Sequence, residues 1–517
     1  MQAITRRFNY LFRSTKGLAL VAIALISLVT AIWGTLSGPM VEWGVKDITV
    51  RLFGLDLVEA EREGRIIMLY HTIAMAVVAI EVYFITASMS MRKHEQATIN
   101  ATITVGYLTA MIFGLWFAYF GHNFVFHGLF LFGQSLVFFA GILLAAALWP
   151  WRKEYQLPKD SPYAHAFGGI DLERAAFFTM AAATLGSALF GAVAGAYFGN
   201  GFESFLAEDV VREPHKTALQ LSVIGHLHIM LALIAVAITL IVGRWLDFKG
   251  TLHKIAMLLM IPGTLILSVG AWLVVPFEAI AHYIIYGGST LVMLAALMLV
   301  IFGWNKLIHE RLAEQGIQKA GGWQGLRALL HDPLKFGSLW QMVYMNFTVS
   351  GVGIFMAVKL DEIIRVWPAR EERIALTGHW HILSAIVATI ILLYYADMVG
   401  LKGKVRQWLG WLIILGSDLA FGAVTVFSLK RLFVSESAQQ PVVNWTLLLA
   451  DIGLALVLVV LAAFIVWRLY DLFKGNGRWV QELAEAGLSV PPPTANSPTQ
   501  PVQQAETGPT LGQEVTQ

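Results

Sequence analysis

Two short motifs in this chain place histidines two residues apart, Gly225-His226-Leu227-His228 and Gly378-His379-Trp380-His381. A neutral imidazole is the commonest metal ligand among the side chains and a usual axial ligand of haem iron. Residues two apart on a helix point roughly 200° apart around its axis, so one motif could supply imidazoles to two different centres. The residue types and their spacing therefore predict metal or haem ligation.

The two motifs belong to a repeat. A third, weaker copy begins at His71, because the spacing from His71 to Gly106 equals that from His228 to Gly263 and from His381 to Gly416. Three copies of one unit, each with a histidine near its start, predict a metal or haem held inside a helical bundle. Other positions coincide when the second motif is laid on the first without a gap: Ile229 with Ile382, Ala232 with Ala385, Ala235 with Ala388, Lys249 with Lys402 and Gly250 with Gly403.

The composition identifies the elements that must position these histidines. Hydrophobic residues make up 57% of the 517 residues and charged residues only 14%, and apolar runs of about 20 residues are long enough to cross a bilayer. The sequence predicts an all-α membrane protein with twelve transmembrane helices in three quasi-equivalent four-helix sets. The expected spans are 17–38, 66–90, 101–120, 126–148, 174–198, 217–243, 254–275, 280–303, 339–359, 377–398, 407–428 and 444–469.

Charge gives the expected orientation. Most Lys and Arg residues fall at the termini and in the even-to-odd loops, which predicts that both termini are cytoplasmic and that the histidines lie toward the outer face. We expect a multi-pass protein of a bacterial or archaeal inner membrane. Residues 1–474 form the expected haem-binding membrane domain, and 475–517 a cytoplasmic tail, largely disordered. The net charge of +2 implies no nucleic-acid partner, and the absence of Cys excludes iron–sulfur clusters and covalently attached c-type haem in this chain.

Twelve spans in three sets, a histidine on the second span and the His-x-His motif on the tenth resemble the catalytic subunit of the haem–copper oxidase superfamily. The segment from Tyr344 to Phe355 and the motif that follows look most similar to the nitric oxide reductase branch. The resemblance implies that His71 and His381 hold a low-spin haem and that His379 holds a high-spin haem, with His379 at the catalytic centre. It also implies that Lys430 and Arg431 bind haem propionates; ordinary interfacial anchoring is the alternative.

The sequence departs from that family at the third metal. His226 matches the family's ligand on the sixth span, but the His-His pair expected on the seventh is absent, and that region offers Glu278, an expected catalytic residue, and His282. His228 has no counterpart in the family. These four residues either form a rearranged nonhaem site, which would suit iron better than copper, or are hydrogen-bonded structural groups.

Two acids fall inside expected spans. Glu81 lies on the second span and Asp418 on the eleventh, where an ionisable side chain is costly and must face protein or a water-filled cavity. Both are expected either to relay protons or to join helices by hydrogen bonds.

These observations predict a respiratory membrane oxidoreductase subunit with two b-type haems and a further nonhaem iron or copper. It would pass electrons from a membrane quinol or a cytochrome donor on the outer face to a small gas, NO or O2. One alternative is an NO dismutase. Another is a haem-bearing electron-transfer or structural subunit that has lost the gas-reducing centre, which the missing His-His pair favours.

Overall fold

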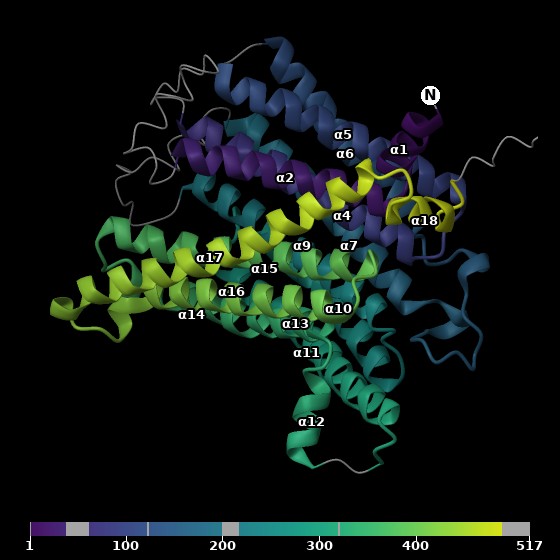
Figure 1. The fold of residues 1–517 in the computed structure, drawn as a ribbon. Helices are drawn as coiled ribbons and strands as arrows, with labels where there is room; N and C mark the ends of the chain where they lie inside the picture. Colours follow the sequence, from purple (N-terminus) through teal and green to yellow (C-terminus); the bar gives the residue numbers. More distant parts are fainter. Residues whose placement is uncertain (1, 38–61, 121–123, 199–216, 319–320, 489–517) are drawn as a thin grey trace, which may run out of the picture.

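The computed structural model describes residues 2–37, 62–120, 124–198, 217–318 and 321–488, and within these ranges the chain is built from helices (Figure 1). Twelve membrane spans are present in this part of the chain, as predicted. They are α2 (Thr15–Ser37), α4 (Arg62–Ser88), α5 (Lys93–Phe120), α6 (Phe124–Ala147), α7 (Leu172–Phe198), α9 (Ala218–Trp245), α10 (Thr251–Trp272), α11 (Glu278–Glu314), α13 (Pro333–Val343) continuing through the π-helix η6 (Tyr344–Val349) into α14 (Ser350–Val358), α15 (Ala369–Met398), α16 (Gly403–Leu429) and α17 (Glu436–Phe473).

The repeated glycines join the third helix of each set to the fourth. A Cβ atom on Gly106 of α5 would lie 2.8 Å from a backbone nitrogen of α6, and one on Gly416 of α16 would lie 2.9 Å from a backbone oxygen of α17. Gly263 of α10 meets α11 in the same way, with 2.9 Å to the Cβ atom of Leu291. Small residues permit such close helix contacts in membranes. The third and fourth helices of every set are therefore joined at the same repeat position.

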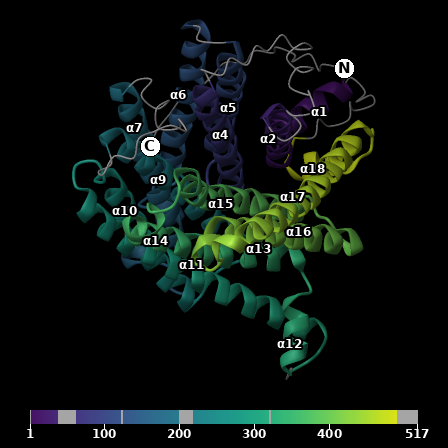
Figure 2. The same cartoon turned by 90° about the vertical axis from the view of Figure 1, so that its left-hand side faces the viewer.

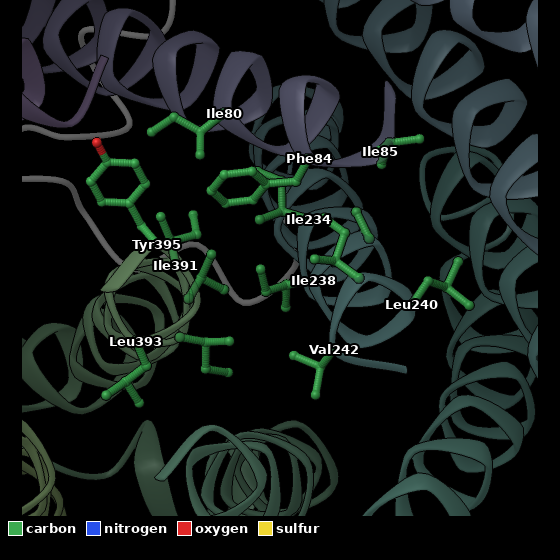
Figure 3. Packing of buried hydrophobic residues seen from close by; sticks show 14 of the residues in the cluster. Ile80, Phe84, Ile85, Ile234, Ile238, Leu240, Val242, Ile391, Leu393 and Tyr395 are labelled. Atoms are coloured by element: carbon green, nitrogen blue, oxygen red, sulfur yellow. The ribbon is translucent and has the colours of Figure 1, made fainter. Parts of the chain in front are cut away.

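The second helices of the three sets, α4, α9 and α15, pack against one another through buried apolar side chains (Figure 3). Ile80 and Phe84 of α4, Ile238 of α9 and Ile391 of α15 are all buried there. The rings of Phe84 and Tyr394 on α15 contact edge to face with centroids 4.7 Å apart. All three histidine-bearing helices are thus fixed against one another by a continuous apolar core.

The two ends of the described chain lie together, with α1 (Gln2–Arg13) beside α18 (Arg478–Glu485) in both views (Figures 1 and 2). Tyr10 donates a hydrogen bond of 2.6 Å to Glu482, and Arg468 of α17 donates another of 2.6 Å to the same carboxylate. Helix α18 belongs to the segment 475–517 that the sequence analysis treats as a tail, so the start of that segment is folded. Residues 489–517 lie outside the described residues.

Candidate functional site

The start of α9 fixes the position of its two histidines. Thr217 caps the helix: its side chain accepts a hydrogen bond from the backbone of Gln220, and the side chain of Gln220 accepts one from the backbone of Thr217. His226 and His228 follow in the third turn and contact different neighbours, on α4 and α15 respectively. One helix therefore supplies imidazoles to two junctions, as the angular spacing of the motif requires.

The first histidine junction lies between α4 and α9. The rings of His71 and His226 have centroids 6.4 Å apart and planes inclined by 20°. Nδ1 of His226 lies 3.2 Å from the backbone carbonyl oxygen of Ser187 on α7, and because a carbonyl only accepts, Nδ1 carries the proton and Nε2 the lone pair. The ring lies against Gly191 of α7, where a Cβ atom would come within 2.3 Å of it.

The second junction lies between α9 and α15. The rings of His228 and His379 have centroids 5.9 Å apart and planes inclined by 36°. Nδ1 of His228 donates to the backbone carbonyl of Ile224 at 2.8 Å, and its Nε2 accepts a hydrogen bond of 3.1 Å from the indole of Trp380. The lone pair of His228 is therefore engaged by an N–H donor.

The third junction lies between α15 and α4. Nε2 of His381 lies 2.8 Å from the hydroxyl of Tyr70, and the two rings contact edge to face. At the first junction His226, the first histidine of its motif, faces His71, which occupies the second histidine position of the preceding repeat. At the second junction His379 faces His228 in the same way. At the third junction the sequence carries Leu69 at the position equivalent to His226 and His379. The repeat thus yields two histidine pairs and one tyrosine–histidine pair.

A small cavity lies on the side of His379 away from α9. Two buried polar atoms belong to its walls: Oγ of Ser428, which has no hydrogen-bond partner, and Nδ1 of His379, which makes no hydrogen bond of regular geometry although backbone groups of Ala375 and Leu376 interact with the ring. The wall opposite His379 includes the end of the π-helix η6, an irregularity that often marks functional sites. The cavity is lined by Thr348, Val349, Val352, His379, Ile382, Thr425, Ser428 and Leu429.

The basic pair expected to bind propionates contacts an acid of the chain itself. Arg431 forms a hydrogen-bonded ion pair with Glu371 of α15, and Nζ of Lys430 lies 3.7 Å from the same carboxylate. The hydrogen bond from Arg431 lowers the pKa of Glu371 below its ordinary value. Glu371 precedes His379 by about two turns, so this cluster joins the 3₁₀ helix η8 (Lys430–Leu432), which follows α16, to the histidine-bearing helix α15. The role of Lys430 and Arg431 toward propionates stays a prediction.

The four residues considered for a nonhaem site are spread over different surroundings. His282 stacks on Tyr286 of its own helix with centroids 6.2 Å apart, while His226 and His228 face different junctions. Within the described part of the chain, Glu278 included, no group of three or more His, Cys, Asp or Glu side chains is arranged to hold a metal ion. The nonhaem iron or copper stays a prediction that this arrangement does not support.

The two intramembrane acids differ in their surroundings. Asp418 accepts hydrogen bonds from the indole of Trp340 at 2.8 Å and from the amide of Gln341 at 3.1 Å, so it joins α16 to α13. Glu81 is 4% exposed, and its Oε1 has no hydrogen-bond partner. An unpartnered buried carboxyl group is costly as an anion. The contacts of Asp418 fit helix joining, whereas a proton-relay role for Glu81 stays a prediction.

Several contacting residues were not identified by sequence reasoning. Trp380 and Tyr70 each bond to a histidine of the neighbouring repeat, and Ser187 and Gly191 position the ring of His226. The repeat could have identified Tyr70 and Trp380, because each directly precedes the equivalent histidine of its repeat, His71 and His381. Nothing in the sequence distinguished Ser187 or Gly191 on α7.

Comparison with protein-family models, with curated proteins and with solved structures found no match for this chain.

Proposed function

We propose that the chain is a haem-binding subunit of a membrane oxidoreductase of the haem–copper oxidase type, transferring electrons to a small gas, with NO ahead of O2. The observation that carries the proposal is the set of five histidines at the three junctions of α4, α9 and α15. Bound haem would supply one-electron chemistry and, where one axial position is open, binding of a gas.

The residues at the junctions fit haem. Metal–imidazole bonds are about 2 Å long, and a ring centre lies about 1 Å behind its nitrogen, so imidazoles on opposite sides of one metal have centroids about 6 Å apart. The two histidine pairs have separations of 6.4 and 5.9 Å. The fixed tautomer of His226, with Nδ1 donating to a carbonyl, matches the usual arrangement of a ligating histidine.

The gas-binding position belongs to His379 in this proposal. Its ring borders the small cavity and the π-helix η6, and the indole of Trp380 engages the lone pair of His228, the histidine that faces His379 from α9. Glu81 relays protons toward this region, whereas Asp418 joins helices. The orientation proposed from charge puts the histidine layer near the outer face, where a quinol or a cytochrome subunit would deliver electrons.

A second candidate is an electron-transfer or structural subunit that keeps haem but has no gas-reducing centre. The absence of a three-ligand metal group within the described residues favours it. An NO dismutase, which needs no net external electrons, is a variant of the first candidate.

Purified protein distinguishes these functions. Haem content by the pyridine haemochrome assay, iron and copper analysis, and a reduced spectrum with and without carbon monoxide are measured on one preparation. We expect two haems per chain, of which one binds carbon monoxide. Haem without carbon monoxide binding would favour the electron-transfer subunit, and protein without haem would contradict both candidates.

A further inference from the structure

We infer that the N-terminal helix α1 lies along the membrane surface with its apolar face in the bilayer, and that its cations bind the headgroups of anionic lipids there. The inference involves none of the histidines, so it does not depend on the proposed function.

One face of α1 is apolar and exposed. Ile4, Phe8 and Phe12 follow one another at intervals of four residues, which places them on one side of the helix, and they are 71%, 55% and 37% exposed. The rings of Phe8 and Phe12 contact each other with centroids 4.9 Å apart. An apolar stripe of this kind is unfavourable in water and is typical of a helix that lies in the membrane interface.

The opposite face of α1 is fixed to the last helices of the chain. The buried ring of Tyr10 contacts Trp479 of α18, with centroids 6.1 Å apart. Arg7 donates hydrogen bonds of 2.9 Å to the carbonyl oxygens of Leu472 and Phe473. Because these two residues end α17, the twelfth span, the bonds hold α1 at the level where that span ends. The ring of Phe473 is exposed at this level, as is common for aromatic side chains at the boundary between membrane and water.

The chain bends between α1 and the first span. The hydroxyl of Ser14 donates a hydrogen bond of 2.6 Å to the carbonyl of Tyr10 and accepts one of 3.1 Å from the backbone of Gly17. Only glycine fits at position 17, because a Cβ atom there would overlap the carbonyl group of Tyr10. As a result, α1 runs across the axis of α2 in both views (Figures 1 and 2). A helix that crosses a spanning helix at its end runs along the membrane surface.

The charge of this segment selects the kind of lipid. The first 37 residues contain Arg6, Arg7, Arg13 and Lys16 but no Asp or Glu. Arg13 is exposed and directly follows Phe12 of the apolar stripe. Cations beside an apolar helix face attract anionic headgroups. They also disfavour a second copy of α1 as the partner of this face, because the two helices would bring like charges together.

Spin labelling tests the position of α1 in the full-length protein. Because the chain contains no cysteine, Phe8→Cys can carry a single nitroxide label. Gln481→Cys, at an exposed position of α18, is the matched control. Both proteins are placed in nanodiscs of phosphatidylcholine and phosphatidylglycerol. We expect oxygen, which concentrates in the bilayer, to relax the label at residue 8, and a water-soluble nickel chelate to relax the label at residue 481.

Two outcomes would overturn the position. Access of the nickel chelate to residue 8 equal to its access to residue 481 would place the apolar face in water. Protection of residue 8 from both reagents would mean that protein covers the face, and dipolar broadening between two labels would identify that protein as a second copy of the chain.

The preference for anionic lipid is tested by raising the phosphatidylglycerol fraction in steps. We expect the label at residue 8 to become better protected from the nickel chelate as the fraction rises. Adding Arg13→Gln should increase the fraction needed for the same protection roughly 5-fold, the effect of one cation near an anionic surface. Lys159→Gln, which removes an exposed cation from the loop between α6 and α7, should leave the response unchanged. Protection that does not change with the phosphatidylglycerol fraction would overturn the assignment to anionic headgroups.

Discussion

The indole N–H of Trp380 donates a hydrogen bond of 3.1 Å to Nε2 of His228, across the junction of α15 and α9. His228 is the histidine whose ring lies 5.9 Å from that of His379. Trp380, which stands between His379 and His381 in the sequence, therefore engages the lone pair of His228. In the proposed function, this contact would keep His228 from becoming a second ligand of the haem that His379 would hold.

Replacing Trp380 by Phe keeps an aromatic ring and removes the donor. Because one hydrogen bond is worth about 0.5–1.5 kcal/mol, we expect the low-spin fraction of the haem held by His379 to rise roughly 2–10-fold as His228 becomes free to bind. Carbon monoxide binding should fall in parallel. Electron paramagnetic resonance and carbon monoxide titration measure both effects.

Adding His228→Ala to the Trp380→Phe variant provides the control, and it should restore the high-spin signal. A Trp380→Phe protein with the spectrum of the wild type would show that the indole does not restrain His228.

His379→Ala should remove carbon monoxide binding and leave the low-spin haem in place. In the proposed function, His379 would hold the gas-binding haem, because its ring faces α9 and borders the small cavity, and other histidines would hold the low-spin haem. Difference spectra of the reduced protein with carbon monoxide measure the effect, and His282→Ala serves as the matched control that keeps the binding. Loss of every haem in His379→Ala would mean that one imidazole supports both centres.

The sequence predicted the framework of the molecule well. Hydrophobic run length located all twelve spans, since crossing a bilayer requires about 20 mainly apolar residues in every helix. The spacing from histidine to glycine also identified positions that are structurally equivalent, because Gly106, Gly263 and Gly416 each allow the same close helix contact. Such constraints are local to a single helix or to one adjacent pair.

The contacts of the site were less predictable. The angular separation of His226 and His228 followed from helical geometry, but which helix each would face depends on how three distant helices pack. The contact between Lys430 or Arg431 and Glu371 has the same origin, since the residues come from η8, after α16, and from α15. The family resemblance predicted haem or metal contacts for these residues. It did not predict Ser187 and Gly191 beside His226, because that contact depends on how α7 packs against α9.

The repeat glycine on α16 offers a test of the packing. Gly416→Ala would put a Cβ atom 2.9 Å from the backbone oxygen of Gly453, and overpacking of this kind costs about 1–3 kcal/mol. Gly422 on the same helix has no atom within 4 Å of a new Cβ, so Gly422→Ala should be neutral or stabilise the helix by up to about 1 kcal/mol. Unfolding in detergent, followed by circular dichroism, compares the two variants. Equal stabilities would contradict the close contact of α16 with α17.

The ion pair between Glu371 and Arg431 predicts a dependence of stability on pH. The partner lowers the pKa of Glu371 in the folded protein below its ordinary value of 4.5, so the unfolded chain binds a proton more readily than the folded one. The contribution to stability is therefore complete above the unfolded pKa and disappears as the pH falls through the lowered folded pKa. Both side chains are partly exposed, at 25% and 21%, which limits the contribution to about 0.2–1 kcal/mol.

Glu371→Gln should accordingly lower the melting temperature at pH 7 and have no effect at a pH below the lowered pKa of Glu371 in the folded protein, where the wild-type carboxylate is also neutral. Glu436→Gln is the matched control, because Glu436 lies 3.6 Å from the same Arg431 but its side chain is 89% exposed. Its removal should change the melting temperature little at either pH. Equal melting temperatures of Glu371→Gln and the wild type at pH 7 would contradict a stabilising ion pair. Higher haem retention in Glu371→Gln would show that the carboxylate competes with a haem propionate for Lys430 and Arg431.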